Sequence, residues 1–212
     1  LRDELKKNDL KCVLTHISGD KLAADAASVA KDHSVFGCDN IGLGYFKFDL
    51  EDDSFERFFN KYPPVAKELY ENGKYFMYHN HAHEFMKING KTILEIFAEG
   101  MDKDTMGITL DTYWVQKAGG DPAFWLEKLS GRIDILHLKD LKVTFSDEGR
   151  WAVRQQLCEI GNGNLAWDRI LRTAEATGVK HIVVEQDNGW IDGDPFKSIE
   201  VSRKYLDKFM KN

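Results

Sequence analysis

The stretch KYFMYHNHAHEF, residues 74–85, places three histidines directly after a run of apolar and aromatic residues. His79, His81 and His83 occupy alternate positions, although the whole chain contains only 7 histidines. Alternate side chains of an extended strand point to the same face of a sheet. The stretch therefore predicts a buried strand whose carboxyl end presents imidazoles to one surface, which faces water, a core or a metal.

Length, composition and charge limit the class of protein. The chain has 212 residues, 42% of them hydrophobic and 30% charged, which is ordinary for a globular protein and predicts one domain over residues 1–212. The net charge of -6 argues against a nucleic-acid partner. No apolar run reaches the roughly 18 residues of a membrane span, so no membrane partner is expected. Cys12, Cys38 and Cys158 show no paired metal spacing, which is typical of reduced thiols in a cytoplasmic protein.

Short β-type stretches alternate with helical ones along the chain. Strands are predicted over residues 11–18, 40–45, 74–81, 106–112, 133–140 and 181–187. Between them, apolar residues recur at helical spacing over residues 20–33, 54–73, 121–129 and 165–178. Asp121 before Pro122 indicates a helix start, whereas Gly73 and Gly178 indicate helix ends. Strands that are apolar on both faces predict a parallel sheet covered by helices, an α/β fold.

Six strand–helix units fit a (β/α)8 TIM barrel that lacks its first two strands in this chain. The chain begins at Leu1, and residues 1–11 form a helical stretch with no strand before it. This start favours the N-terminally incomplete barrel, although a six-stranded open sheet remains possible on strand count alone. The positions of the polar residues favour the barrel.

Residues of the kind that bind metals follow each strand from the third onward. They include Glu84, Asp111, His137 and Glu185. The carboxyl ends of barrel strands meet at one rim, where active sites lie. Several carboxylates are costly to bury together without a cation. Three oxygens and one nitrogen suit Mn²⁺, Mg²⁺, Co²⁺ or Fe²⁺, and zinc is less natural. Each residue also has a simpler interpretation: an exposed turn, a helix cap, a surface ion pair or a charged loop.

Five motifs together resemble the xylose-isomerase-like TIM-barrel family of sugar isomerases and epimerases, including its inosose dehydratase-like branch. They are YHNHAHEF (78–85), LDTYWVQKAGGDP (110–122), ILHLKD (135–140), EIGNGNLAWDRIL (159–171) and VVEQDN (183–188). The resemblance implies one divalent metal ion, with manganese expected first, held by Glu84, Asp111, His137 and Glu185. Abasic-site endonucleases of the superfamily are disfavoured, because the chain is acidic and lacks their additional Asp-x-His pair.

Such a site removes a proton next to a carbonyl while a metal stabilises the resulting enediolate. His81 is the candidate base, since a neutral imidazole titrates near working pH. Glu84 and Glu185 are candidates for base as well as ligand. Lys139 either steadies negative charge on the substrate or forms a rim ion pair with Asp140. The substrate-binding candidates are His16, His79, Asn80, Trp114, Lys139 and Asp187, with Trp190 as a further apolar face.

The sequence therefore predicts a cytoplasmic, metal-dependent sugar isomerase or epimerase of carbohydrate metabolism. One alternative is a lyase or dehydratase acting on keto-sugars, keto-glycosides or inosose, and another is a non-catalytic sugar-binding barrel. The glycines of GNGN, residues 161–164, suggest phosphate binding or simply a tight turn. The absence of an adjacent Arg or Lys favours an unphosphorylated sugar or cyclitol. The sequence leaves open whether the chain forms a homo-oligomer.

Overall fold

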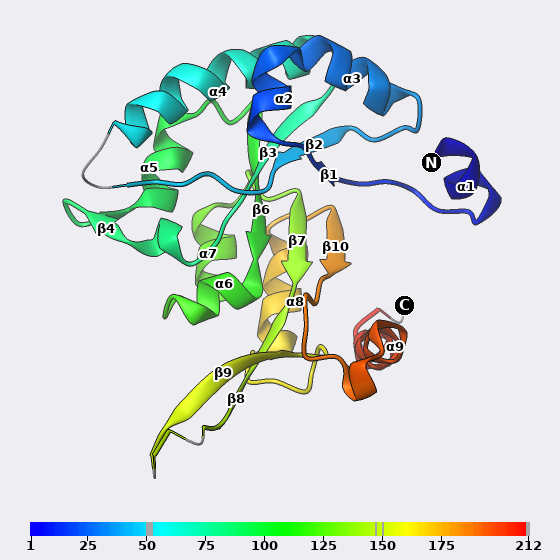
Figure 1. Ribbon diagram of the computed structural model, residues 1–212, viewed down its shortest axis with the longest axis vertical. Helices are drawn as coiled ribbons and strands as arrows, with labels where there is room; N and C mark the ends of the chain where they lie inside the picture. The colour runs from blue at the N-terminus through cyan, green and yellow to red at the C-terminus, as the bar shows by residue number, and fades with distance from the viewer. Residues whose placement is uncertain (50–52, 147, 150, 211–212) are drawn as a thin grey trace. The chain divides into compact units, whose positions relative to one another are not determined.

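The computed structural model describes residues 1–49, 53–146, 148–149 and 151–210 (Figure 1). The chain forms two compact units, Leu1–Thr109 and Leu110–Asn212, and the boundary between them falls within strand β6 (Met106–Asp111). The expectation of one domain over residues 1–212 stays a prediction. No helix among the described residues is both long enough and apolar enough to cross a membrane.

The predicted strands are present and pair in the order β1-β2-β3-β6-β7-β10. The β1–β2, β2–β3, β3–β6 and β7–β10 pairs are parallel. The strands of this order other than β6 are β1 (Thr15–His16), β2 (Asn40–Leu43), β3 (Tyr75–His79), β7 (Ile135–Leu138) and β10 (His181–Val184). β1 has two residues and is much shorter than the strand predicted over 11–18. Before its first residue, the Asn40 side chain donates a hydrogen bond to the Val13 carbonyl at 2.9 Å. A side-chain contact thus replaces the ladder there.

Polar side chains cap the starts of three of the helices described in the first unit, by Ser18, Asp25 and Thr92. The helices described in this unit are α1 (Arg2–Lys7), α2 (Gly19–Ala24), α3 (Ala26–Ser34), α4 (Ser54–Glu71) and α5 (Ile93–Gly100). The single helix predicted over 20–33 is in fact two, because Asp25 leaves helical geometry and caps α3 by accepting the Ser28 N–H at 2.8 Å. As predicted, a helix ends just before Gly73, which has a φ of +70°.

An aromatic core fills the first unit between its helices and strands. Phe58 of α4 stacks on Phe97 of α5 with ring centroids 4.4 Å apart, and Tyr78 of β3 meets Phe97 edge-on at 4.9 Å. Each of these three side chains is fully buried. Figure 1 shows α2, α3 and α4 along the same side of strands β1 to β3. Burying these aromatic faces fixes β3, and with it the histidines at its carboxyl end. The short segments that follow are η1 (His83–Phe85), β4 (Lys87–Ile88) and β5 (Lys91–Thr92).

The second unit adds helices around β7 and β10 and a long antiparallel hairpin. Its helices are α6 (Thr112–Lys117), α7 (Pro122–Lys128), α8 (Trp167–Ala176), η2 (Ile191–Gly193) and α9 (Pro195–Leu206). The predicted cap is confirmed, since Asp121 accepts the Ala123 N–H at 3.1 Å. The hairpin of β8 (Asp140–Phe145) and β9 (Val153–Cys158) was not predicted; it extends from the rest of its unit in Figure 1.

One buried carboxylate organises the segment between the hairpin and α8. Asp140 is fully buried and accepts hydrogen bonds from five N–H groups: those of Leu141, Gly161, Gly163 and Leu165, and the Trp167 indole, at 2.7 to 3.4 Å. A Cβ on Gly163 would overlap this carboxylate. The glycines of GNGN therefore let backbone amides surround Asp140, which explains their presence as a turn.

We expect Asp140→Asn to lower the free energy of unfolding by about 3 kcal/mol or more. The amide removes the charge and points an N–H group at surrounding donors, and each hydrogen bond to a charged acceptor contributes about 1.5–3 kcal/mol. Urea unfolding followed by circular dichroism measures the change. Asp134→Asn is the control, because its side chain is partly exposed and its ion-pair partner Lys180 is exposed, and its expected change is below about 1 kcal/mol. Equal small losses in both variants would contradict the role of Asp140.

Candidate metal and substrate site

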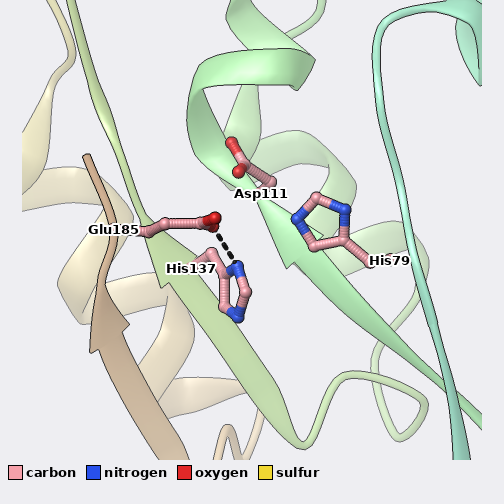
Figure 2. A group of neighbouring side chains, drawn as sticks. All are labelled: His79, Asp111, His137 and Glu185. Carbon is pink, nitrogen blue, oxygen red and sulfur yellow. Dashed lines mark hydrogen bonds and ion pairs between the residues drawn. The ribbon is translucent and has the colours of Figure 1, made fainter. Parts of the chain in front are cut away.

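Three side chains of types that can bind a metal converge in the second unit at the carboxyl ends of strands. They are Asp111 at the end of β6, His137 on β7 and Glu185 just after β10, and one ligand atom of each lies within 4.8 Å of the others. Figure 2 shows these side chains pointing toward one another. Asp111 and His137 are buried, whereas Glu185 is one-third exposed. The arrangement joins a nitrogen and two carboxylates at a point that remains partly open to solvent.

Neighbouring hydrogen bonds orient each member of this set. His137 Nδ1 lies 2.6 Å from Glu185 Oε2 (Figure 2). Asp111 Oδ1 accepts the Trp114 N–H at 3.1 Å and so caps α6. The Thr112 hydroxyl lies 2.9 Å from the Lys139 carbonyl oxygen and accepts the Lys139 N–H at 3.0 Å. The start of α6 is therefore tied to the end of β7, which holds Asp111 and His137 in register.

The ammonium group of Lys139 lies close to several carboxylates of the second unit. Its side chain is 2% exposed, and its Nζ lies 2.7 Å from Asp187 Oδ2 and 3.6 Å from both Asp111 Oδ2 and Glu185 Oε1. Burial alone would lower the pKa of Lys139, but the charge of Asp111 and the contacts with Asp187 and Glu185 outweigh it and raise that pKa above 10.5. Lys139 is therefore a buried ammonium. Pairing with Asp140, the simpler interpretation of HLKD, is wrong, because Asp140 accepts backbone N–H groups instead.

The donor set fits a divalent cation. Two oxygens and one imidazole nitrogen are ligands that Mg²⁺, Mn²⁺ and Zn²⁺ accept. Ligand atoms on opposite sides of such an ion lie about 4 Å apart, since each metal–ligand bond is about 2 Å. A mutual separation of at most 4.8 Å therefore asks for little movement. Lys139 and a metal ion would share the neutralisation of the same carboxylates.

In the first unit, Glu84 is held by its own neighbours. It is fully buried, its Oε1 accepts the Tyr78 hydroxyl at 2.5 Å, and its Oε2 accepts the His81 N–H at 2.8 Å. Burial, together with the Glu84 charge, raises the pKa of Tyr78 well above its ordinary value, so this hydroxyl remains a donor. Glu84 therefore fixes the turn that follows β3. Tyr78 carries no polar signal in the sequence, because it lies in the apolar run of the strand.

The predicted histidines form a row of neighbouring rings within the first unit. The His79 and His81 ring centroids are 4.9 Å apart, and the His81 and His83 centroids are 5.8 Å apart. The exposed His16 ring lies edge-on to His79 at 5.3 Å. Tyr45, which the sequence analysis did not select, contacts His81 edge-on at 5.5 Å. The first unit thus offers an imidazole-rich surface at the carboxyl end of β3.

The parallel pairing of β3 with β6 places His79 at the carboxyl end of β3. His79 pairs with Thr109 in the β3–β6 register, and Asp111 follows Thr109 by two residues on β6. Residues paired in parallel strands, and residues two apart on one strand, share a face of the sheet. Asn80, the next residue after β3, is fully buried, and its N–H donates to the Thr109 carbonyl at 3.4 Å.

Other predicted substrate-binding residues have contacts of their own. The Trp114 ring lies beneath the Lys117 ammonium at 4.8 Å and faces that of Lys139 at 5.7 Å. Trp190 is 37% exposed and donates from its indole to the Gln186 carbonyl at 3.0 Å. Both indoles therefore pack against polar neighbours and leave part of their apolar surface accessible.

Glu159, which follows the hairpin, is a further buried carboxylate that the sequence did not reveal. Glu159 is 3% exposed and accepts hydrogen bonds from Ser198, Asn162 and Gln186 at 2.7, 3.3 and 3.4 Å. Burial alone would raise the pKa of Glu159, but these hydrogen bonds outweigh it and lower the pKa below 4.5. Nothing in EIGNGN distinguishes Glu159 from a surface glutamate. Folding brings these donors around it, and Ser198 of α9 makes the shortest of the three contacts.

Comparison with known proteins identifies the family. The family described as xylose isomerase-like TIM barrel matches residues 3–209, nearly the whole sequence, and the chain belongs to it. Among curated proteins, an inosose dehydratase from Lacticaseibacillus casei is 25% identical over 189 residues, which cover 84% of this chain and 62% of that protein. The chain thus spans less than two thirds of the length of this relative.

Solved structures share the fold at low sequence identity. A sugar phosphate isomerase/epimerase from Parabacteroides distasonis superposes with a TM-score of 0.80 at 20% identity, covering 98% of this chain and 79% of that one. A xylose isomerase-like TIM barrel protein from Mycobacterium smegmatis, in complex with magnesium, has a TM-score of 0.71 at 14% identity, covering 97% and 74%. Together with the family match, these likenesses show an α/β TIM-barrel fold, and the six parallel strands are consistent with an incomplete (β/α)8 barrel.

We expect Glu159→Gln to change how stability depends on pH. A carboxyl whose pKa is lowered by folding contributes stability above its ordinary pKa of 4.5, and this contribution disappears as pH falls through the lower folded value. The stability difference between wild type and variant should therefore be largest near neutral pH and shrink below pH 4.5. Urea unfolding at a series of pH values measures it. The exposed Glu175→Gln should show little difference at any pH, and a pH-independent gap for Glu159→Gln would contradict the expectation.

We expect Lys139→Met to destabilise the metal-free protein by about 3–5 kcal/mol at neutral pH. The change removes the ammonium that faces buried Asp111, and removing one partner of a buried ion pair costs about that much. Thermal and urea unfolding in the presence of a chelator measure the loss. Lys180→Met is the matched control, because Lys180 pairs with Asp134 at the surface. A loss no greater than that of the control would show that Asp111 does not depend on Lys139.

Proposed function

We propose that this member of the xylose isomerase-like family is a divalent-metal-dependent sugar isomerase or epimerase that removes a proton next to a substrate carbonyl. The observation that carries the proposal is the convergence of Asp111, His137 and Glu185 within 4.8 Å. The enzymes named among its similar proteins act as an isomerase/epimerase or as a dehydratase. A small sugar or cyclitol is therefore the proposed substrate, and the cytoplasm the proposed compartment.

Asp111, His137 and Glu185 would hold the ion, with Mn²⁺ as the first candidate. Bound there, a divalent ion supplies Lewis-acid polarisation of a carbonyl oxygen and stabilises negative charge that develops on it. Glu84 is the proposed fourth ligand from the sequence, but its two oxygens accept hydrogen bonds from Tyr78 and His81. His79 is the competing candidate from the sequence, because it ends the strand that precedes Glu84.

The chain's own residues provide the proton transfer and the charge balance. Glu185 is partly exposed and hydrogen-bonded to His137, and we assign it, with His81 and Glu84, to the candidates for removing and returning the proton. The Lys139 ammonium would steady negative charge on a substrate oxygen, while Asp187 keeps that ammonium oriented. His16, Asn80 and Trp114 are proposed to contact the substrate.

A dehydratase is the second candidate, and the inosose dehydratase similarity favours it. The first step is the same: a base takes the proton on the carbon next to the carbonyl. In a dehydratase the electron pair then expels the hydroxyl of the following carbon, which leaves as water after accepting a proton. In an isomerase or epimerase no group leaves, and the proton returns to the other carbon or to the other face.

Metal analysis tests the proposal at its foundation. We expect inductively coupled plasma mass spectrometry to find about one divalent ion per chain after reconstitution with Mn²⁺. His137→Ala and Glu185→Ala should lose it, whereas Asp134→Asn, which lies before the amino end of β7 and pairs with Lys180, should keep it. No ion in the reconstituted wild type would overturn the enzymatic proposal and leave a sugar-binding protein. Comparing Glu84→Gln with His79→Asn decides which of them contributes to binding.

Incubation with keto-sugars and inososes in heavy water distinguishes the two reactions. An isomerase or epimerase returns a product with the same number of every element, in which one carbon-bound hydrogen is replaced by deuterium. The replacement occurs because the abstracted proton exchanges with the heavy water before a proton is returned. A dehydratase yields a product lighter by one water. Mass spectrometry reads both outcomes. Binding of a sugar by calorimetry with neither mass change would favour the non-catalytic alternative.

A further inference from the structure

The segment that follows β10 carries two of the charged residues of the proposed site. Glu185 Oε2 lies 2.6 Å from His137 Nδ1, and Asp187 Oδ2 lies 2.7 Å from Lys139 Nζ. Both belong to segment 185–191, in which the Glu185 N–H donates to the Leu138 carbonyl at 3.0 Å and the residues from 186 to the start of η2 at Ile191 are irregular. Side chains this precisely placed on a loop need support from elsewhere in the unit.

Buried polar groups outside the site provide contacts to both ends of this segment. Near its start, the Gln186 amide donates to Glu159 Oε1 at 3.4 Å. At its far end, the Ile191 N–H donates to the Ser198 hydroxyl at 2.9 Å, and that hydroxyl donates in turn to Glu159 Oε1 at 2.7 Å. Ser198 is fully buried on α9. A single hydrogen-bonded pair therefore reaches residues 186 and 191.

The middle of the segment is folded tightly between these two points. The Trp190 indole donates to the Gln186 carbonyl at 3.0 Å, and the Gln186 amide also donates to the Asn188 carbonyl at 3.1 Å. Gly189 has a φ of +73°, and a Cβ on it would come within 2.8 Å of the Leu157 carbonyl oxygen of β9. The segment therefore has little freedom to shift while its ends are held.

We propose that Glu159 and Ser198 are a positioning pair that fixes segment 185–191 and thereby the Glu185 and Asp187 carboxylates. The proposal rests on the proposed function in so far as Glu185 is a metal ligand. Within the described part of the chain, Glu159 contacts the segment through Gln186, and Ser198 contacts it through Ile191. A buried carboxylate is costly unless it is hydrogen-bonded, so Glu159 is stable only while its donors are in place. This dependence makes the arrangement specific to one loop conformation.

The chain offers a matched control on the same helix. Ser202 lies one helical turn after Ser198, is equally buried, and accepts the Ile160 N–H at 3.0 Å. Its hydroxyl helps to dock α9 through Ile160 of the segment after β9, outside residues 185–191. Ser198→Ala and Ser202→Ala thus remove the same group from the same helix at equal burial. Glu159→Gln is the third variant, and Ser198→Ala keeps the test open if Glu159→Gln does not fold.

Hydrogen exchange followed by mass spectrometry tests whether the positioning pair holds segment 185–191 in place, and the experiment needs no metal. We expect peptides covering residues 185–191 to exchange about tenfold faster in Ser198→Ala than in wild type, since one net hydrogen bond is worth about that factor. In Ser202→Ala the same peptides should be unchanged. Equal acceleration in both variants, or none in either, would overturn the inference.

Calorimetric titration with Mn²⁺ tests the consequence for the site. We expect Ser198→Ala to raise the dissociation constant for Mn²⁺ by about 10–100-fold, which is the usual effect of removing the hydrogen bonds that support a metal ligand. Ser202→Ala should leave this constant nearly unchanged. Equal affinity in wild type and Ser198→Ala would overturn the positioning pair while the proposed function stands. A wild type that binds no Mn²⁺ would overturn the proposed function instead, and hydrogen exchange alone would then decide whether the pair holds the segment.

Discussion

The buried carboxylate of Asp140 is the constraint on which the second unit depends. A charge withdrawn from water must find hydrogen-bond donors, and here they come from backbone amides of the GNGN segment and from the Trp167 indole. The segment can surround the carboxylate only because Gly163 has no side chain. The start of α8 and the end of the hairpin are thereby fixed to the residue that follows Lys139.

The candidate site depends on the opposite situation, in which several carboxylates compete for positive charge. Lys139 contacts Asp111, Glu185 and Asp187 from a position that is almost fully buried. Lys139 shares one positive charge among three carboxylates, and the ligand atoms of Asp111, His137 and Glu185 are close enough to receive a divalent ion. A divalent ion bound there would add positive charge next to the same carboxylates. His137 adds the nitrogen that distinguishes this set from a purely acidic cluster.

Family membership and site chemistry support each other at different levels. The xylose isomerase-like match covers nearly the whole chain and is independent of any single side chain. The donor set, by contrast, comes from the ends of three strands and would be chemically suggestive in any fold. Between isomerisation and dehydration the difference lies in whether a hydroxyl leaves after the shared proton removal.

Local signals in the sequence determined the elements that periodicity and caps encode. The alternation of apolar strands with helices, the Asp121 cap and the helix ends before Gly73 and Gly178 follow from short-range chemistry, and the structure confirms them. The family resemblance was readable as well, because its motifs lie in order along the chain. The break at Asp25 and the shortness of β1 were not, since each depends on one side chain competing for backbone partners.

Only the tertiary structure decided which polar side chains are buried and with whom they pair. Asp140 and Glu159 look like ordinary surface acids in the sequence, yet packing removes both from water and makes them anchors. One of the two roles predicted for Lys139 was an ion pair with its neighbour Asp140, whereas its partners come from the ends of other strands. Residue types and their order follow from local chemistry. Desolvation and the choice of partner depend on segments brought together from far apart in the chain.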